Sequence, residues 1–239
     1  KRNGKGVYTW KGGAKYDGEW TNDLKNGTGV MIWEDGSKYE GEWKNGERHG
    51  KGTFYYTNGD KYVGDWNADV QHGKGVYYFQ NGERYEGDYV GGERTGNGVY
   101  IYPNGDKYEG QFKAGWQEGT GVFTWTNGAV YDGQWVKNQR SGQGFYKWGN
   151  GDEYRGSWKN NMADGQGELR TNDGSVYTGS FVKGHEDGKG ILVTPDGTRF
   201  EGSFRQGKKD GPFVEKDASG KIIRQGTFRY GRLLEEKKP

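Results

Sequence analysis

The sequence contains no cysteine, few long aliphatic side chains and no long apolar run. Without cysteine, the chain forms no disulfide framework and offers no thiolate as a nucleophile or metal ligand. Leucine occurs five times and only 29% of the 239 residues are hydrophobic, whereas an ordinary globular chain is nearer half apolar. No segment is long and apolar enough to predict a membrane-spanning helix. These absences argue against an ordinary globular core, and they favour an intracellular, cytoplasmic protein.

An excess of charge of one sign is also lacking. The 35 Lys and Arg residues nearly balance the 33 Asp and Glu residues, so the net charge at pH 7 is +2. A balanced chain has no overall field to attract nucleic acid, and we expect no nucleic-acid partner. Disorder would explain the low hydrophobicity, but disordered chains are poor in aromatic residues. Here Phe, Trp and Tyr make up 16% of the sequence and recur regularly, which predicts an ordered chain.

The sequence is instead rich in a 23-residue repeat of glycine and aromatic residues. A Tyr-Glu-Gly-Glu-Trp motif at 39–43 is followed by Gly-Lys-Gly at 50–52. The aromatic residue that opens each unit returns every 23 residues, without insertion or deletion, at Tyr16, Tyr39, Tyr62, Tyr85, Tyr108, Tyr131, Tyr154, Tyr177 and Phe200. A fixed period of this size is typical of a repeat array.

We predict one continuous array over residues 1–233. It consists of a partial repeat (1–15), eight complete repeats (16–199) and a degenerate C-terminal cap (200–233). The cap is predicted because the repeat pattern breaks down there, as it does in the end units of other repeat proteins. We expect residues 234–239 to form a charged, frayed tail.

Within a unit, the pattern predicts two β-strands joined as a hairpin. Tyr39, Gly41 and Trp43 alternate with Glu40 and Glu42, which is the period-2 pattern of a strand with two unlike faces. The second segment, 50–56, is rich in residues that favour strands, and no helical period is present. The predicted fold is all-β: an elongated single-layer antiparallel sheet of tandem β-hairpins, shaped as a twisted rod or trough.

The turn between successive units decides which side chains share a face. Asn-Gly and Asp-Gly sequences stand there, and a two-residue type I′ turn is one possibility. Pro103 and Pro195 favour a three-residue loop, in which a type I turn is followed by a left-handed glycine. In this register Met31 faces Tyr39, and the rings and framework glycines are segregated from the charges. We prefer the three-residue loop, with the glycines leaving slots for neighbouring rings.

In this register the second strands present aromatic side chains that a single layer leaves uncovered. A large uncovered apolar strip usually marks an interface, and Trp and Tyr are common anchors of interfaces. The alternative is that the rings only stack on one another. The predicted partner-binding residues of this groove are Met31, Trp33, Phe54, Tyr56, Tyr77, Phe79, Tyr100, Tyr102, Phe123, Trp125, Tyr146 and Trp148. A variable loop position adds three contact candidates, Leu24, Trp116 and Met162.

The polar residues do not predict a catalytic or metal site. His49 and His72 occupy corresponding loop positions in successive units, but the later units hold Thr95, Glu118 and Ser141 there, and a zinc site needs several converging ligands. The recurring carboxylates are better explained as cross-strand charge pairs. Each Gly-x-Gly precedes a strand and not a helix, so it predicts no phosphate site. We expect a non-enzymatic protein with no catalytic residue, no metal and no cofactor.

The spacing of Tyr-Glu-Gly-Glu-Trp and Gly-Lys-Gly resembles the MORN (membrane occupation and recognition nexus) repeat family, over about residues 4–204. The resemblance implies tandem antiparallel hairpins that serve as a scaffold and structural protein in a larger assembly. In this family such assemblies are often part of the cytoskeleton or the cilium. The resemblance also implies a protein partner, either a helical or extended segment bound in the aromatic groove or a second copy of the chain as a homo-oligomer.

Two other functions stay open at the level of sequence. A membrane-associated module that binds acidic phospholipid headgroups would need a cluster of basic residues on one face. The nearest candidates are Arg205, Lys208, Lys209, Arg229 and Arg232, and acidic residues are interleaved with them. The array could also be the accessory part of an enzyme whose catalytic domain lies outside this sequence. Of the three, the scaffold is favoured.

Overall fold

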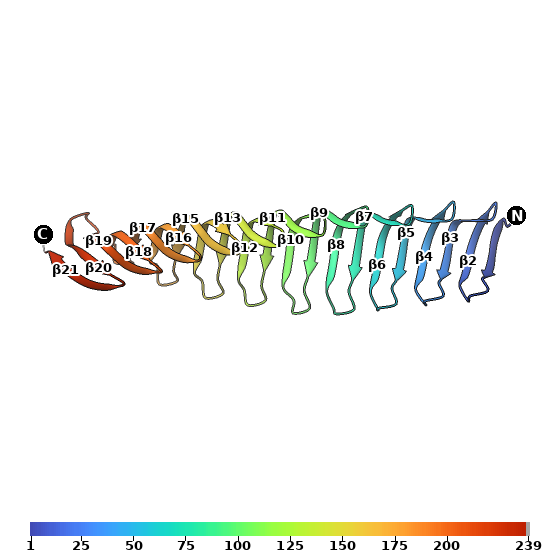
Figure 1. Ribbon diagram of the computed structural model, residues 1–239, viewed down its shortest axis with the longest axis horizontal. Coiled ribbons are helices and arrows are strands. Elements are labelled where there is room, and N and C mark those ends of the chain that lie inside the picture. The colour runs from blue at the N-terminus through green and yellow to red at the C-terminus, as the bar shows by residue number, and fades with distance from the viewer. Residues whose placement is uncertain (238–239) are drawn as a thin grey trace. The chain divides into compact units, whose positions relative to one another are not determined.

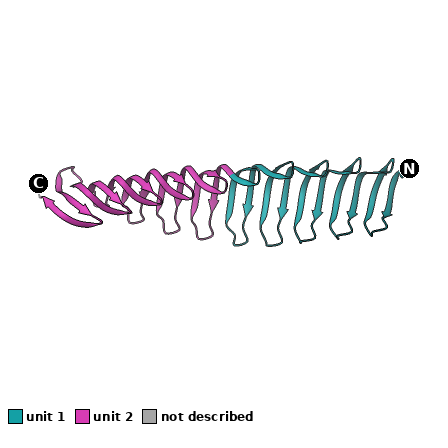
Figure 2. Cartoon of the chain, in the orientation of Figure 1, with its two compact units in different colours: residues 1–117 teal, residues 118–239 magenta. Residues whose placement is uncertain are grey.

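The computed structural model describes residues 1–237, in which the regular elements are all β-strands (Figure 1). Over this range there is no helix of the length and apolarity that crossing a membrane requires. The chain divides into two compact units, residues 1–117 and 118–239 (Figure 2). Within each unit, consecutive strands pair antiparallel.

From β2 to β19, short first strands alternate with longer second strands. In unit 1 the strands are β1 (Gly4–Thr9), β2 (Lys15–Thr21), β3 (Leu24–Ile32), β4 (Lys38–Lys44), β5 (Glu47–Tyr55), β6 (Lys61–Asn67), β7 (Val70–Tyr78), β8 (Arg84–Val90), β9 (Glu93–Ile101) and β10 (Lys107–Lys113). β11 (Trp116–Thr124) begins at the end of unit 1. In unit 2 the strands are β12 (Val130–Val136), β13 (Gln139–Lys147), β14 (Glu153–Lys159), β15 (Met162–Arg170), β16 (Val176–Val182), β17 (His185–Val193), β18 (Arg199–Arg205), β19 (Lys208–Lys216), β20 (Ile222–Arg229) and β21 (Arg232–Lys237).

The strand pattern confirms the predicted fold class. From β2 to β18 the first strands begin every 23 residues, and each is seven residues long and followed by a nine-residue second strand. Each unit is therefore a single layer of tandem antiparallel hairpins, as the alternation of rings, glycines and charges predicts.

The loops between successive hairpins have the predicted three residues. The Trp33 amide donates to the Ser37 carbonyl at 2.9 Å, and the Gly36 amide donates back to the Trp33 carbonyl at 3.0 Å. Gly36 has a φ of 86°, the left-handed conformation that this position requires. Met31 consequently pairs with Tyr39. The three-residue register is confirmed, and the two-residue alternative is wrong for this loop.

At the other end of each hairpin, a two-residue turn joins the strands. Asn22 (φ 51°) and Asp23 (φ 71°) are both left-handed, as a type I′ turn requires. Because the turn uses only two residues, the second strand begins directly after it. The prediction that the three contact candidates lie in loops is therefore wrong. Leu24, Trp116 and Met162 are the first residues of β3, β11 and β15.

Each second strand also carries a bulge that the alternation did not predict. Gly41 pairs with Gly52, but the next residue, Glu42, pairs with His49, so β5 holds two extra residues at this point. Gly50 lies there with a left-handed φ of 59°. A bulge bends its strand, and the bend turns the tip of the hairpin back over the aromatic face of the sheet, where the tip side chains contact the rings.

The core consists of rings that lie against glycines. Tyr39 is fully buried, and an added Cβ on Gly52 would overlap its ring. Trp43 meets the Tyr39 ring edge-on with centroids 5.1 Å apart, and Trp66 of the next hairpin does so at 5.4 Å. The predicted glycine slots are confirmed, and the bent tips allow one layer of strands to cover its own rings. The fully buried tyrosines are Tyr16, Tyr39, Tyr62, Tyr85, Tyr108, Tyr131 and Tyr154.

The C-terminal hairpins keep the strand pairing but change the core. Phe213 pairs with Gly202, where a glycine stands in the regular units, and its ring stacks on Phe200 at 5.3 Å. β20 and β21 follow as a further antiparallel pair. The first four residues of the predicted charged tail, 234–237, belong to β21. Residues 238–239 lie outside the described residues.

Candidate functional site

A row of half-exposed rings lies near the ends of the second strands in unit 1, and we call it the aromatic row. Its members are Phe54, Tyr56, Tyr77, Phe79, Tyr100 and Tyr102. Successive ring centroids lie 4.5 to 6.0 Å apart. The predicted groove residues of unit 1 are therefore brought together, and they both stack on one another and keep exposed surface. Trp33 extends the row at 5.4 Å from Phe54, whereas Met31 is only 6% exposed and belongs to the core.

Unit 2 carries a corresponding but shorter row. Phe123 and Trp125 lie 4.4 Å apart, Trp125 and Tyr146 lie 5.4 Å apart, and Tyr146 and Trp148 lie 4.6 Å apart. Trp148 is the most open of these rings, with 37% of its surface exposed. The three contact candidates at the hairpin tips of both units are more exposed than Trp148. Leu24 is 47% exposed, Trp116 is 50% exposed and Met162 is 41% exposed.

Cations from the bent hairpin tips cover the rings of unit 1. The Arg48 guanidinium lies 5.0 Å from the Phe54 ring centroid and 4.4 Å from the Trp66 ring. It also forms an ion pair with Asp69 in the next turn, with 3.0 Å between Nε and Oδ1. Such cation–π contacts hold the tip over the rings. The row is therefore a strip of apolar surface with a charged, hydrogen-bonded border.

The phenols of the aromatic row are held in their neutral form. Tyr77 donates its O–H to the Asp60 carboxylate at 2.9 Å. Burial and, second, this hydrogen bond raise the pKa of Tyr77 above its ordinary range. Burial likewise raises the pKa of Tyr100. At physiological pH these groups act as rings with one polar end.

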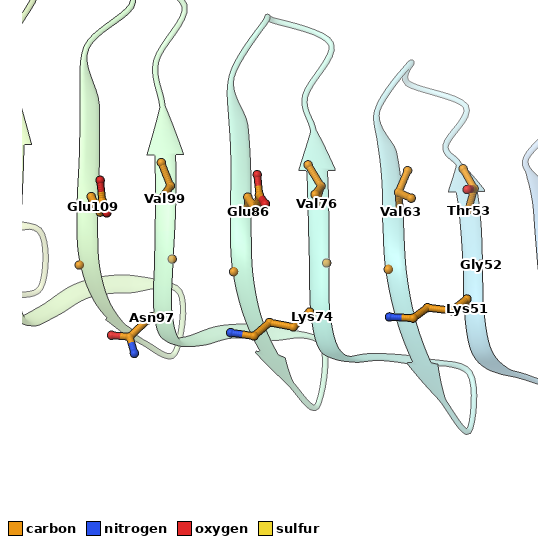
Figure 3. A pocket seen from close by; sticks show the side chains of 15 residues that line it. Lys51, Gly52, Thr53, Val63, Lys74, Val76, Glu86, Asn97, Val99 and Glu109 are labelled. Carbon is orange, nitrogen blue, oxygen red and sulfur yellow. The ribbon is translucent and has the colours of Figure 1, made fainter.

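The opposite face of unit 1 carries a groove, which the sequence did not predict (Figure 3). Its volume is about 910 Å³, and paired glycines such as Gly52 and Gly64 form its floor. Figure 3 shows one row of side chains with Lys51, Lys74 and Asn97, and another with Thr53, Val63, Val76, Glu86, Val99 and Glu109. The predicted register made this the charged face of the strands. The paired glycines were the available signal, because they leave a channel between two rows of side chains.

Charges beside this groove are paired across strands. Lys51 and Asp65 approach to 2.5 Å, and Lys74 and Asp88 to 2.5 Å. The hydrogen bond from Lys74 holds the pKa of the Asp88 carboxyl below its ordinary value. These contacts match the predicted cross-strand charge pairs.

The histidines do not form a metal site. His49 and His72 lie in β5 and β7 and pair with Glu42 and Asp65, so their assignment to loops is wrong. Among residues 1–237, no cluster of three or more His, Asp or Glu side chains is placed to hold a metal ion.

The basic residues considered for lipid binding lie on β18–β21, and some of them have internal contacts. The Lys209 ammonium lies 3.9 Å from the Phe200 ring centroid and pairs with Glu215 at 3.3 Å. Arg205 lies 5.2 Å from the Tyr230 ring centroid. These contacts direct part of the cluster toward the protein itself rather than toward a headgroup.

Comparison with known proteins identifies the family of this array. The model of the MORN repeat matches ten consecutive segments: 1–15, 16–38, 39–61, 62–84, 85–107, 108–130, 131–153, 154–176, 177–199 and 200–212. The chain therefore belongs to the MORN repeat family, which confirms the resemblance in its sequence. No curated protein matches the chain over its sequence.

Solved structures of other β proteins are similar to it at low identity. The wild-type TCP10 domain of Danio rerio CPAP is 14% identical, with 93% of this chain and 99% of that chain covered and a TM-score of 0.47. The SAS-4 (dCPAP) TCP domain of Drosophila melanogaster, in complex with a proline-rich motif of Ana2 (dSTIL), is 16% identical. The match covers 63% of this chain and 82% of that chain, with a TM-score of 0.43. At these values the likeness carries no conclusion about the function of this chain.

Proposed function

We propose that the chain is a non-enzymatic scaffold that binds a protein segment along its aromatic row. The occupant is a helical or extended segment of a partner, or the same face of a second copy. The observation that carries the proposal is the row itself: six rings in unit 1 in continuous contact, all of them with exposed surface. Membership of the MORN repeat family supports the same function and is the reason to expect an intracellular, cytoskeletal or ciliary assembly.

The energetics of the row favour a protein ligand. Rings supply large apolar area at a small cost in side-chain entropy, and Tyr and Trp are frequent hot spots of interfaces. The rings of this row are also held by one another and by the arginines of the tips, so binding immobilises little that is free beforehand. Such preorganisation increases the affinity that a given area provides.

The test compares two faces of one strand. In β7, Tyr77 belongs to the aromatic row, whereas Tyr78 points to the opposite face and lies under Lys61 at 4.4 Å. The double variant Tyr77→Ser/Phe79→Ser and the control Tyr78→Ser are prepared as full chains, and circular dichroism checks that both stay folded. Size-exclusion chromatography with light scattering then gives their mass, and an affinity pull-down from the source cell gives their partners.

We expect wild type and the Tyr78→Ser control to behave alike, and the double variant to lose the partner or the dimer. A monomer near 26.9 kDa that retains a specific protein indicates a foreign occupant, and a dimer indicates a second copy. Partner capture or dimerisation that survives undiminished in the folded double variant would contradict the proposal.

A further inference from the structure

An arginine recurs at the tip of alternate hairpins, 46 residues apart. The four residues are Arg2, Arg48, Arg94 and Arg140. Arg48, Arg94 and Arg140 are each the second residue after a turn. In all four cases the arginine carbonyl accepts a hydrogen bond from the turn of the following hairpin, at 2.9 to 3.1 Å. In each case the guanidinium lies above aromatic rings, at 5.5 Å from Tyr85 in the case of Arg94. The four sites therefore share one backbone geometry.

The sites differ in the residue of the following turn that faces the guanidinium. Arg48 faces Asp69 and pairs with it at 3.0 Å, and Arg2 pairs in the same way with Asp23 at 3.3 Å. Arg140 donates to the backbone carbonyl of Asn161 at 2.8 Å.

Arg94 instead faces Gly115, which has no side chain. Across residues 1–237, no carboxylate forms an ion pair with Arg94. Arg94 thus differs from its three counterparts in the facing turn residue, which is a glycine here and an Asp or Asn at the other three sites.

A hollow of about 290 Å³ lies at this position. Its lining includes Tyr77, Phe79, Tyr89, Glu93, Arg94 and Gly115. Two of these rings belong to the aromatic row, so the hollow opens into the proposed binding surface. A half-buried guanidinium beside rings has lost part of its hydration, and an anion that restores its hydrogen bonds is bound with a large electrostatic gain.

We propose that the hollow at Arg94 is a binding site for a carboxylate carried on a short apolar stem, supplied by an acidic side chain of the segment that lies along the aromatic row. The planar guanidinium matches a carboxylate with two parallel hydrogen bonds, and the rings accept the stem. Glu93 at the same hollow disfavours a more highly charged phosphate group. The carboxylate site stands on its own geometry, and only the source of the carboxylate rests on the proposed function.

The first test uses 3-phenylpropionate as the probe and its neutral amide, 3-phenylpropionamide, as the control. Both are titrated into the full chain, and the guanidinium Nε–H resonance of Arg94 is followed by NMR. We expect a saturable shift with the acid, and at least tenfold weaker binding of the amide. The Arg94→Gln variant should lose the shift of the neighbouring ring protons of Tyr77. Equal binding of acid and amide would overturn the site.

The second test places a carboxylate of the chain itself in the site. Gly115 has a φ of 81°, close to the 65° of Asp69, and a Cβ at Gly115 would meet only Arg94 Nη2, at 3.7 Å. Gly115→Asp is therefore expected to fold, to pair with Arg94 as Asp69 pairs with Arg48, and to weaken probe binding at least tenfold. Gly46→Asp adds the same charge to another tip and should bind the probe as wild type does. Wild-type probe affinity in Gly115→Asp would overturn the inference.

The partner experiment separates this inference from the proposed function. Loss of capture in Tyr77→Ser/Phe79→Ser together with weakened capture in Gly115→Asp supports both. Loss in the ring variant with undiminished capture in Gly115→Asp leaves the scaffold in place and overturns the acidic side chain as the source of the carboxylate. Undiminished capture in the ring variant overturns the proposed function, while the probe titration still decides the carboxylate site.

Discussion

The phenol ring of Tyr39 lies against the backbone of Gly52, in the space that a Cβ at position 52 would occupy. Its hydroxyl donates to the carbonyl of Glu42 at 3.0 Å, so the polar end of this fully buried side chain is satisfied within its own hairpin. The glycine is therefore required by the ring and not by its own backbone conformation. The tyrosine ring fills the space that the second glycine leaves empty, so the repeat needs both residues.

A methyl group at position 52 should therefore destabilise its hairpin. We expect Gly52→Ala to cost about 1–3 kcal/mol, as overpacking of a filled core does. Hydrogen exchange of the β4 and β5 amides measures the change locally, which suits an array that need not unfold in two states. Gly6→Ala is the matched control, because Gly6 holds the same motif position but its Cβ would meet only Trp20 Cδ1, at 4.0 Å. Equal losses in the two variants would contradict the explanation.

The buried phenols predict a loss of stability at alkaline pH. Burial, as the largest cause, raises the pKa of Tyr16, Tyr131 and Tyr154 from 10.0 to about 12. As the pH rises, the unfolded chain loses these phenol protons before the folded chain does. Their contribution to the free energy of unfolding is therefore complete below pH 10 and is lost as the pH rises from about 10 to 12. Each such tyrosine adds a slope of up to about 1.4 kcal/mol per pH unit. Urea unfolding at a series of pH values measures it, and Tyr131→Phe should make the decline shallower.

Lys25 should titrate far below an ordinary lysine. Its ammonium lies 3.7 Å from the Trp43 ring centroid, and desolvation lowers the pKa of Lys25 from 10.5 to about 8. The folded chain releases this proton before the unfolded chain does, so this group makes stability rise between about pH 8 and pH 10.5.

The comparison of wild type with Lys25→Met isolates this effect, because methionine keeps an apolar stem and cannot titrate. Urea unfolding below pH 10, before the tyrosines contribute, should show a rise for wild type and none for the variant. Acetylation followed by mass mapping should also give a half-maximal rate at Lys25 near pH 8. Identical pH profiles of stability for the two chains would contradict the prediction.

Some of the type I′ turns use residues that disfavour the left-handed conformation. Ala68 has a φ of 47° and Asn45, in the equivalent place, has a φ of 51°. Because Asn adopts this conformation more readily than Ala, Ala68→Asn should stabilise its hairpin by about 0.5–1 kcal/mol. The reverse change, Asn45→Ala, should destabilise its own hairpin by a similar amount. Protection of the Asp69 and Gly46 amides from hydrogen exchange reports the two effects, and protection that changes in the same direction in both variants would refute them.

The sequence predicted the parts of this fold that depend on alternation and on turn chemistry. Two prolines and the following glycines indicated the three-residue loop, and this loop placed Met31 opposite Tyr39. The same register placed rings over glycines, as Tyr39 lies over Gly52 in the structure. For the candidate site, the register also brought the aromatic row of unit 1 together, since its members lie on one face of neighbouring second strands.

The parts that the sequence did not predict depend on the bend of the hairpins. The left-handed conformation of Gly50 interrupts the period-2 pattern and brings the tip back over the rings, and an alternation of residues does not encode that turn. The bend also places Arg94 against Gly115 of the next hairpin. These two residues are 21 positions apart and share no motif, so their relationship becomes visible only in three dimensions.

The tips carry a further consequence for how such a chain evolves. Within a unit, a hairpin forms its backbone hydrogen bonds with the hairpin before it and the hairpin after it, as the Asp69 amide does with the Arg48 carbonyl at 3.1 Å. An in-frame duplication of 23 codons therefore inserts a hairpin whose two borders already fit their new neighbours. Each such duplication adds two rings to the aromatic row and repeats the existing core packing. Gene duplication and deletion thus adjust the length of the aromatic row in fixed steps.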